Sequence, residues 1–298
     1  MKLSIGYFAD GPWSHNAFQK IIKDKDLTIK FICVRYDTND QILKQFSEEY
    51  NIPYLKHKDI NSDEFINKIK IFNCDLFVSM SFNQIFKKRI INLPPLKCIN
   101  CHAGKLPFYR GRNILNWVLI NDEKDFGITV HFIDEGIDTG DIILQKCFSI
   151  SNNDTYASLL KIAHVECANI LFESLTLLKQ GKVTIKKQNE IDPIGSYCST
   201  RVIGDENINW NQTSRQLYNF VRAICSPGPQ SRAFLNNKEM KINKVLEINN
   251  STVYKGIIGA ILFKDESGFL VKTADTFVKV VEYEYVGKFK VGDRFEIG

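Results

Sequence analysis

Residues 2–36 read "KLSIGYFADGPWSHNAFQKIIKDKDLTIKFICVRY" and contain a strand pattern, a helix pattern and a second strand pattern in succession. The apolar runs 2–9 and 28–36 have the length and composition of buried strands. Between them, residues 15–24 place their apolar side chains at helical spacing, on one face. This order predicts a β-α-β unit with two parallel neighbouring strands.

The same alternation continues along the first half of the chain. Further strands are predicted at 74–80, 96–102, 128–134 and 141–150, and further helices at 37–51, 59–73 and 154–181. Strands separated by helices of this length predict an α/β fold, with a Rossmann-like, mostly parallel sheet and helices on both faces. The first turn has neither G-x-G-x-x-G nor G-x-x-x-x-G-K-[ST], so its sequence does not favour a dinucleotide site or a P-loop.

The pattern changes after the long helix. Residues 186–207 are polar, with a proline and glycines, and are predicted to form a linker. A helix at 213–224 is followed by short strands with Gly or Asn turns, which predict a small C-terminal β module, an OB-like barrel. We therefore expect a catalytic domain at 1–185 and a C-terminal domain, helix plus β module, at 208–298.

Composition and charge limit the classes of function. The chain has 298 residues, 44% of them hydrophobic, and a net charge of +5. These values are typical of a globular protein with a sizeable core. Lys and Arg are scattered, so the mild positive charge allows an anionic ligand without predicting nucleic acid. The N-terminus does not resemble a signal peptide and no apolar run reaches membrane-spanning length, so we expect a cytoplasmic protein whose eight cysteines are reduced.

The stretch "CINCHAGKLPFYRG", residues 98–111, contains a C-x-x-C motif that could indicate a metal or redox site. A structural zinc site needs four ligands, and no second cysteine pair is present. Redox pairs usually start a helix, where the thiol pKa is lowered, whereas Cys98 and Cys101 are predicted to lie on a strand. We therefore interpret them as small buried hydrophobic residues, and expect no metal.

Polar side chains follow the same strand. Asn100 and His102 share one face at its carboxyl end, where ligands of α/β sheets gather. An amide N–H can stabilise an oxyanion, and an imidazole can carry a proton near neutral pH. A structural histidine is the alternative. The loop in "HFIDEGIDTGDII" (131–143) supplies acidic groups that could orient the imidazole, although a solvated turn remains open; its spacing does not match a calcium loop.

These motifs together resemble the 10-formyltetrahydrofolate-dependent formyltransferase family. The stretch "NCHAGKLPFYRGRNILNWVLINDEKDFGITVHFIDEGIDTGDII" (100–143) contains, in order, Asn-x-His, Leu-Pro, an aromatic residue, Arg-Gly, Gly-[IV]-Thr-x-His and Asp-x-Gly-x-[IL]. The resemblance is close over residues 98–143 and looser over the first 150. It implies a metal-free formyl transfer from 10-formyltetrahydrofolate, the co-substrate, to an amine.

The resemblance also implies roles for individual residues. Asn100 would stabilise the oxyanion of the tetrahedral intermediate, His102 would remove the proton of the amine and protonate the departing folate nitrogen, and Asp138 would hold His102. The family places the pterin beside the loop at 79–86 and the acidic loop. The implied cofactor-binding residues are Met80, Phe82, Ile137 and Asp134. For Phe82 and Ile137, ordinary core packing is the alternative.

The amine substrate depends on the branch of the family. Segment 208–234 resembles the second-domain pattern of methionyl-tRNA formyltransferases, which sugar-nucleotide N-formyltransferases share. A tRNA-binding enzyme should carry a basic insertion after the second strand, whereas segment 34–43 is short and has two aspartates. The loop "FADGPWSHNAF" (8–18) looks like that of formyltransferases acting on nucleotide-linked amino sugars.

We therefore expect a formyltransferase that acts on a dTDP- or UDP-linked amino sugar, in surface polysaccharide (O-antigen, lipopolysaccharide) biosynthesis. The alternatives are methionyl-tRNA formylation and, from another class, a non-catalytic folate- or nucleotide-binding module. A homodimer is expected, with neither nucleic acid nor membrane as a partner. The expected substrate-binding residues are Gly11, Trp13, Ser14, Tyr109, Arg110, Arg112 and Arg222. For Trp13 the alternative is packing at a helix start, and for the arginines a surface ion pair.

Overall fold

The computed structural model describes residues 2–296 and divides the chain into two compact units. The first consists of Met1–Gly111, Phe126–Phe148 and Lys161–Cys198. The second consists of Arg112–Asp125, Ser149–Leu160 and Ser199–Gly298. The domain boundaries expected from the sequence stay a prediction.

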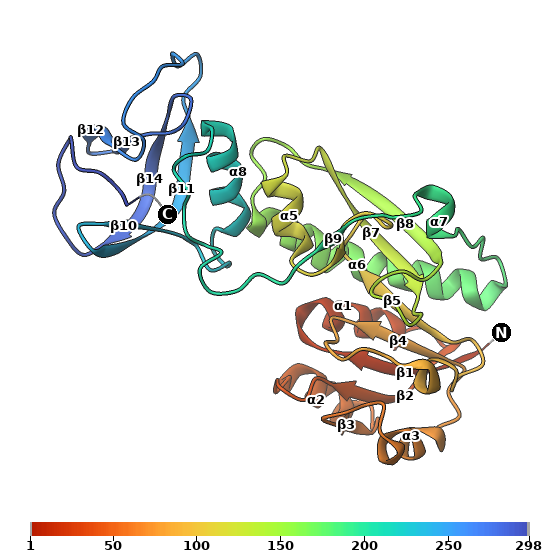
Figure 1. The fold of residues 1–298 in the computed structure, drawn as a ribbon. Helices are drawn as coiled ribbons and strands as arrows, with labels where there is room; N and C mark the ends of the chain where they lie inside the picture. The colour runs from red at the N-terminus through yellow and green to blue at the C-terminus, as the bar shows by residue number, and fades with distance from the viewer. Residues whose placement is uncertain (1, 297–298) are drawn as a thin grey trace. The chain divides into compact units, whose positions relative to one another are not determined.

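The first unit is built on a seven-stranded sheet with the order β3-β2-β1-β4-β5-β7-β8 (Figure 1). Its strands are β1 (Leu3–Ala9), β2 (Leu27–Val34), β3 (Tyr54–Lys56), β4 (Leu76–Met80), β5 (Cys98–His102), β7 (Asp125–Phe132) and β8 (Ile142–Ser149). Strands β3, β2, β1, β4 and β5 run parallel, and β7 pairs antiparallel with β5. The predicted α/β fold with a mostly parallel sheet is confirmed.

Six helices follow or connect these strands. They are α1 (Gly11–Ile21), α2 (Gln41–Glu49), α3 (Asp63–Lys70), α4 (Lys88–Ile91), α6 (Tyr156–Gln180) and α7 (Gln188–Ile191). Helix α1 begins at Gly11, four residues before the predicted start, because Pro12 fits the first turn, where its missing N–H needs no partner. Helix α2 is capped by the Asp40 carboxylate, which accepts a hydrogen bond from the Leu43 N–H.

The centre of the sheet is buried on both faces. Tyr7 and Phe8 point to opposite faces of β1, and both side chains are fully buried. The Phe8 ring packs edge-on against Phe31, Phe77 and Phe86, with centroids 4.9–5.5 Å apart. A strand buried on both faces reads as a continuous apolar run, which is why the sequence predicted β1 without any alternation.

The second unit contains two whole helices, the start of α6 and a five-stranded antiparallel sheet with the order β10-β11-β14-β13-β12 (Figure 1). Its elements are α5 (Ile114–Ile120), α8 (Ser214–Ile224), β10 (Ser231–Leu235), β11 (Lys238–Glu247), β12 (Ile261–Asp265), β13 (Gly268–Lys272) and β14 (Phe277–Tyr285). Leu235 forms a bridge with Phe295, and Ala260 forms one with Arg294. The segment with Arg294 and Phe295 thus pairs beside both edge strands of the sheet, β10 and β12, as a barrel-like module requires.

Helix α5 was not predicted. Five of its seven residues are buried, so its sequence "ILNWVLI" lacks the polar face that marks a surface helix. Helix α8 was predicted, and its Leu217 and Val221 side chains join the core of the β module.

Candidate active site

Strand β5 carries the two polar residues that the sequence analysis singled out. In the antiparallel pairing of β5 with β7, Asn100 lies opposite His131 and His102 lies opposite Thr129. The His102 and His131 side chains are buried, and Asn100 is half-buried. The pairing therefore adds a second histidine to the predicted site.

Asp138 lies between the two imidazoles. Its Oδ2 is 3.6 Å from Nδ1 of His102, and its Oδ1 is 3.5 Å from Nε2 of His131. The Gly111 N–H donates to Oδ2 at 2.9 Å. Because Gly111 has a φ of +98° and a Cβ there would lie 2.3 Å from the Cys198 carbonyl oxygen, only glycine fits this position without strain. The structure thus brings the three predicted catalytic residues together.

The Asp138 carboxylate is ionised in this setting. Burial raises its pKa, but the charges of His102 and His131 and the hydrogen bonds from His131 and the Gly111 N–H together outweigh burial. The pKa of Asp138 is therefore well below its ordinary value. A carboxylate held ionised can stabilise a proton that arrives on a neighbouring imidazole.

The orientation of the His102 ring is fixed by the backbone. Nε2 lies 2.7 Å from the Tyr109 carbonyl oxygen, an acceptor, so Nε2 carries a proton and Nδ1 faces Asp138. Gly104 makes this contact possible, because a Cβ at this position would lie 2.4 Å from Nε2 and 2.5 Å from the Tyr109 oxygen. Nδ1 of His102 is therefore the atom that can gain and lose a proton.

His131 orients the amide of Asn100. Nδ1 of His131 lies 2.7 Å from the Phe132 carbonyl oxygen and donates to it. Nε2 of His131 lies 3.3 Å from Nδ2 of Asn100, and this contact sets the orientation of the amide. The second N–H of this amide stays available to an oxyanion. Sequence reasoning missed His131, although it is the histidine of the Gly-[IV]-Thr-x-His motif.

Arg110, which was expected to contact substrate, has a buried side chain whose guanidinium is bound by the protein. Nε and Nη2 donate to Oε1 of Gln188 at 3.0 and 2.8 Å. Nη1 donates to the Ile194 carbonyl and to the Tyr197 hydroxyl at 3.1 and 3.0 Å. These contacts give Arg110 a structural role, and a contact with substrate stays a prediction.

Gln188 connects this arginine to the acidic loop. Its Nε2 donates to the carbonyl oxygens of Asp138 and Gly140 at 2.8 and 2.7 Å. Asp138 has a φ of +55°, an unusual conformation that these hydrogen bonds help to hold. Sequence reasoning missed Gln188 because it lies in the polar segment predicted to be a linker.

Replacing Gln188 with Leu should destabilise the first unit. The change removes both donations to the acidic loop and leaves the buried Arg110 guanidinium without its main acceptor. We expect the free energy of unfolding to fall by about 2–3 kcal/mol, as measured by urea denaturation. Gln19→Leu is the matched control, since Gln19 is exposed on α1. If the two variants had the same free energy of unfolding, Gln188 would not stabilise the acidic loop.

The residues implied to bind the folate lie after β4 and in the acidic loop. Met80 ends β4 and is buried, whereas Ile137 is exposed. The Phe82 ring packs against Phe8 at 5.5 Å, as expected for core packing. The Asp134 carboxylate accepts hydrogen bonds from the Gly136 N–H and the Thr139 hydroxyl. Their contact with folate stays a prediction.

The loop at the end of β1 holds three of the expected substrate-binding residues. The Gly11 N–H donates to Oδ2 of Asp40 at 2.7 Å, so this first N–H of α1 is not free for a pyrophosphate. The Trp13 ring packs edge-on against His164, with centroids 4.7 Å apart. Ser14 is buried, and its hydroxyl donates to the Gly11 carbonyl. Their contact with substrate stays a prediction.

The other three expected contacts have different surroundings. Tyr109 contributes its carbonyl oxygen to His102. Arg112 is exposed. Arg222 is buried in the second unit, where its guanidinium donates to the side chain of Asn219 and to the carbonyls of Ser151 and Asp154. It lies 3.6 Å from the Asp122 carboxylate. These contacts anchor Arg222 structurally, and substrate contacts at all three residues stay predictions.

The two cysteines of the C-x-x-C motif are free and buried. Burial raises the pKa of the Cys98 thiol, which packs in the core of the first unit. The Cys101 thiol donates to the Cys167 carbonyl at 3.5 Å. Both behave as small core residues, as the sequence indicated.

Comparison with known proteins places this chain in a family. Residues 22–175 match the model described as formyl transferase, and residues 204–292 match that of the formyl transferase C-terminal domain. The chain belongs to the formyl transferase family. The recognised family, its N-formyltransferase chemistry and the two-part fold are therefore confirmed.

Sequence relatives of this formyltransferase include methionyl-tRNA formyltransferases. The chain is 33% identical to that of Ruminiclostridium cellulolyticum over 245 residues, which cover 82% of this chain and 77% of the relative. It is 28% identical to that of Halothermothrix orenii over 312 residues, which cover 99% of this chain and 97% of the relative. The similarity thus extends over both units.

Solved structures with the same fold include sugar formyltransferases. The sugar 3N-formyl transferase WlaRD, with dTDP and 5-N-formyl-THF, has a TM-score of 0.72 and 24% identity, and the match covers 95% of this chain and 98% of that one. The N-formyltransferase of Helicobacter canadensis, with folinic acid and dTDP-3-aminofucose, has a TM-score of 0.66 and 23% identity, covering 95% and 100%. At this identity the likeness supports the fold alone.

The relatives correct the expected substrate. The sequence analysis favoured a nucleotide-linked amino sugar, but relatives that match most of the chain at 28–33% identity are methionyl-tRNA formyltransferases. The accompanying expectation that no nucleic acid is bound loses its support as well. The preference rested on segments 8–18 and 34–43, and loops vary more among homologues than the elements they connect. Within residues 2–296, no helix is long and apolar enough to cross a membrane.

Proposed function

We propose that this formyltransferase transfers the formyl group of 10-formyltetrahydrofolate to the amino group of methionyl-tRNA. The observation that carries the proposal is the geometry of Asn100, His102 and Asp138, in a chain that matches methionyl-tRNA formyltransferases over both units. The alternative of a non-catalytic binding module is not favoured, because Asp138 is held ionised against an oriented imidazole.

The roles of the residues follow from their contacts. The free N–H of Asn100 donates to the oxygen that gains negative charge when an amine attacks a formyl carbon. Nδ1 of His102 accepts the proton that the amine loses, and Asp138 stabilises the imidazolium. His131 keeps Asn100 in the orientation that the oxyanion needs. The same Nδ1 can then deliver the proton to the departing nitrogen.

The loop after β4 offers a fitting place for the folate. Oδ1 of Asn83 is buried and has no hydrogen-bond partner among the described residues, while Nδ2 donates to Asp37 at 3.1 Å. A buried acceptor without a donor costs about 1–3 kcal/mol, which a pterin N–H could offset. Met80 and Phe82 precede Asn83 closely in the chain and would add apolar contacts. When bound, the co-substrate supplies the formyl group.

A substrate panel tests the proposal. The purified protein is incubated with 10-formyltetrahydrofolate and, separately, with methionyl-tRNA, uncharged tRNA, and dTDP- and UDP-linked amino sugars. Mass spectrometry then reports which compound gains the mass of one formyl group. We expect formylation of methionyl-tRNA, and none of uncharged tRNA, which lacks the amine.

Two outcomes would contradict the proposal: formylation of an amino sugar with none of methionyl-tRNA, and no formylation of any amine in the panel. The cytoplasmic location and the homodimer expected from the sequence stay predictions, which cell fractionation and sedimentation would check.

A further inference from the structure

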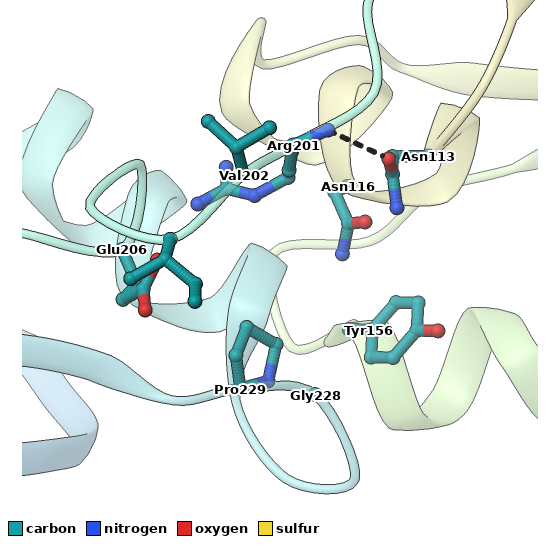
Figure 2. A pocket seen from close by; sticks show the side chains of 9 residues that line it. Asn113, Asn116, Tyr156, Arg201, Val202, Glu206, Gly228 and Pro229 are labelled. Carbon is teal, nitrogen blue, oxygen red and sulfur yellow. Dashed lines mark hydrogen bonds between the residues drawn. The ribbon is translucent and has the colours of Figure 1, made fainter.

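The second unit contains a cavity of about 280 Å³ that the formyl-transfer centre does not use. Figure 2 shows its lining, which comes from the start of α5, the start of α6, the segment before α8 and the turn after α8. The lining residues are Asn113, Asn116, Tyr156, Arg201, Val202, Ile203, Glu206, Gly228 and Pro229. All of them belong to the second unit.

Asn116, a buried residue, provides a hydrogen-bond acceptor in the lining of the cavity. Its side chain is 5% exposed, and Nδ2 donates to the Ala223 carbonyl at 2.5 Å. Because a carbonyl accepts, this hydrogen bond fixes which side of the amide is nitrogen. Oδ1 is then left without a hydrogen-bond donor among the described residues. An acceptor in a cavity lining that receives no donor from the protein can accept a hydrogen bond from a bound molecule.

Asn113 provides a matching donor at the rim. Its Oδ1 accepts a hydrogen bond from the Arg201 backbone N–H at 3.0 Å (Figure 2), which fixes this amide as well. Nδ2 of Asn113 therefore remains a donor. The carboxylate of Glu206, a buried residue of the lining, is bound by the protein: Oε2 accepts from the Gly204 N–H at 3.0 Å, and Oε1 lies 3.4 Å from Nε of Arg232.

The rest of the lining is aromatic or apolar. The Tyr156 ring is half-buried, and its hydroxyl has no hydrogen-bond partner among the described residues. Val202 and Pro229 add apolar surface, and Ile203 is 95% exposed at the rim. An exposed isoleucine beside a cavity offers contact area to a bound molecule.

We propose that this cavity binds a single unstacked nucleobase. A nucleobase has flat faces that pack on a tyrosine ring and on apolar side chains, and an edge that carries donors and acceptors. Because Asn116 accepts, bases with an exocyclic amino group, such as adenine and cytosine, should bind more tightly than uracil, which has none. The base can come from a free nucleotide or from an unpaired RNA end. The inference does not depend on the proposed function, because it concerns binding alone.

Nucleotide titrations test the inference. The full chain is titrated with AMP, CMP, UMP and ribose 5-phosphate, and binding is followed by saturation-transfer NMR and calorimetry. We expect AMP and CMP to bind, UMP to bind roughly tenfold more weakly, and ribose 5-phosphate, which lacks a base, not to bind. A short single-stranded oligoribonucleotide then distinguishes the sources: tighter binding than AMP indicates an RNA end, and equal binding a free nucleotide.

Two substitutions and a control test whether AMP binds in this cavity. Asn113→Asp keeps the acceptor for the Arg201 N–H and removes the free donor, so it should weaken AMP binding roughly tenfold or more. Tyr156→Leu removes the ring and should weaken binding similarly. Asn209→Asp is the control, because Asn209 lies outside the lining and its Oδ1 likewise accepts a backbone N–H, that of Asn211. It adds the same charge and should leave binding unchanged.

The inference is overturned if no nucleotide binds at millimolar concentration, or if AMP binds the Asn113→Asp and Tyr156→Leu variants as tightly as the parent. Should Tyr156→Leu fail to fold, the Asn113→Asp result decides, because Asn113 is exposed. The two proposals can fail separately. If the parent protein bound AMP, the Asn113→Asp variant did not, and neither protein formylated methionyl-tRNA, the proposed function would be overturned and this inference supported.

Discussion

We expect the Asn100→Ala variant to transfer formyl groups about 10²–10³-fold more slowly than the parent protein, measured as kcat. The Asn100 amide is oriented by Nε2 of His131, 3.3 Å away, and keeps one N–H for a developing oxyanion. Removing such a donor affects the transition state more than the ground state, so KM should change little.

The control for this prediction is Asn92→Ala. Asn92 is an exposed asparagine of the same unit, and its Nδ2 donates to the Lys88 carbonyl. Its removal should leave kcat unchanged. If Asn100→Ala kept the parent kcat, or lost activity only through a raised KM, Asn100 would not be the oxyanion donor.

Gly104→Ala should lower kcat by about 10²-fold, because an added Cβ displaces His102. The Cβ would lie 2.4 Å from Nε2 of His102 and 2.5 Å from the Tyr109 oxygen, so the hydrogen bond between them cannot persist. Without it, Nδ1 loses its place beside Asp138. Overpacking should also lower the free energy of unfolding by about 1–3 kcal/mol.

The Gly181→Ala variant is a control that distinguishes a loss of activity from a loss of stability. Gly181 has a φ of +64°, and no atom lies within 4 Å of an added Cβ. Gly181→Ala should therefore cost stability through backbone strain, about 1–2 kcal/mol, without touching the site. Equal kcat values for the Gly104→Ala and Gly181→Ala variants would show that Gly104 does not position His102.

The sequence predicted those parts of the site that depend on local periodicity. Asn100 and His102 share a strand face because strand side chains alternate, and the strand end was recognisable from its apolar run. Asp138 was implied by the family resemblance, and the structure places it between the two histidines. The buried β1 was predicted for the same reason as β5.

Other parts depend on contacts between distant segments. The register between β5 and β7 places His131 opposite Asn100, and no local pattern reveals it. Gln188 lies in a polar segment, yet it is buried because the Arg110 guanidinium needs an acceptor. Such partners become visible only when the tertiary structure is known.

The most direct test of the central claim is single-turnover transfer of an isotope-labelled formyl group from 10-formyltetrahydrofolate to methionyl-tRNA. The parent protein and its His102→Asn variant are compared by rapid quenching. We expect label on the methionine nitrogen with the parent protein, and transfer about 10²–10⁴-fold slower with the variant. Absence of label on methionyl-tRNA with the parent protein, or equal rates for the two proteins, would contradict the account.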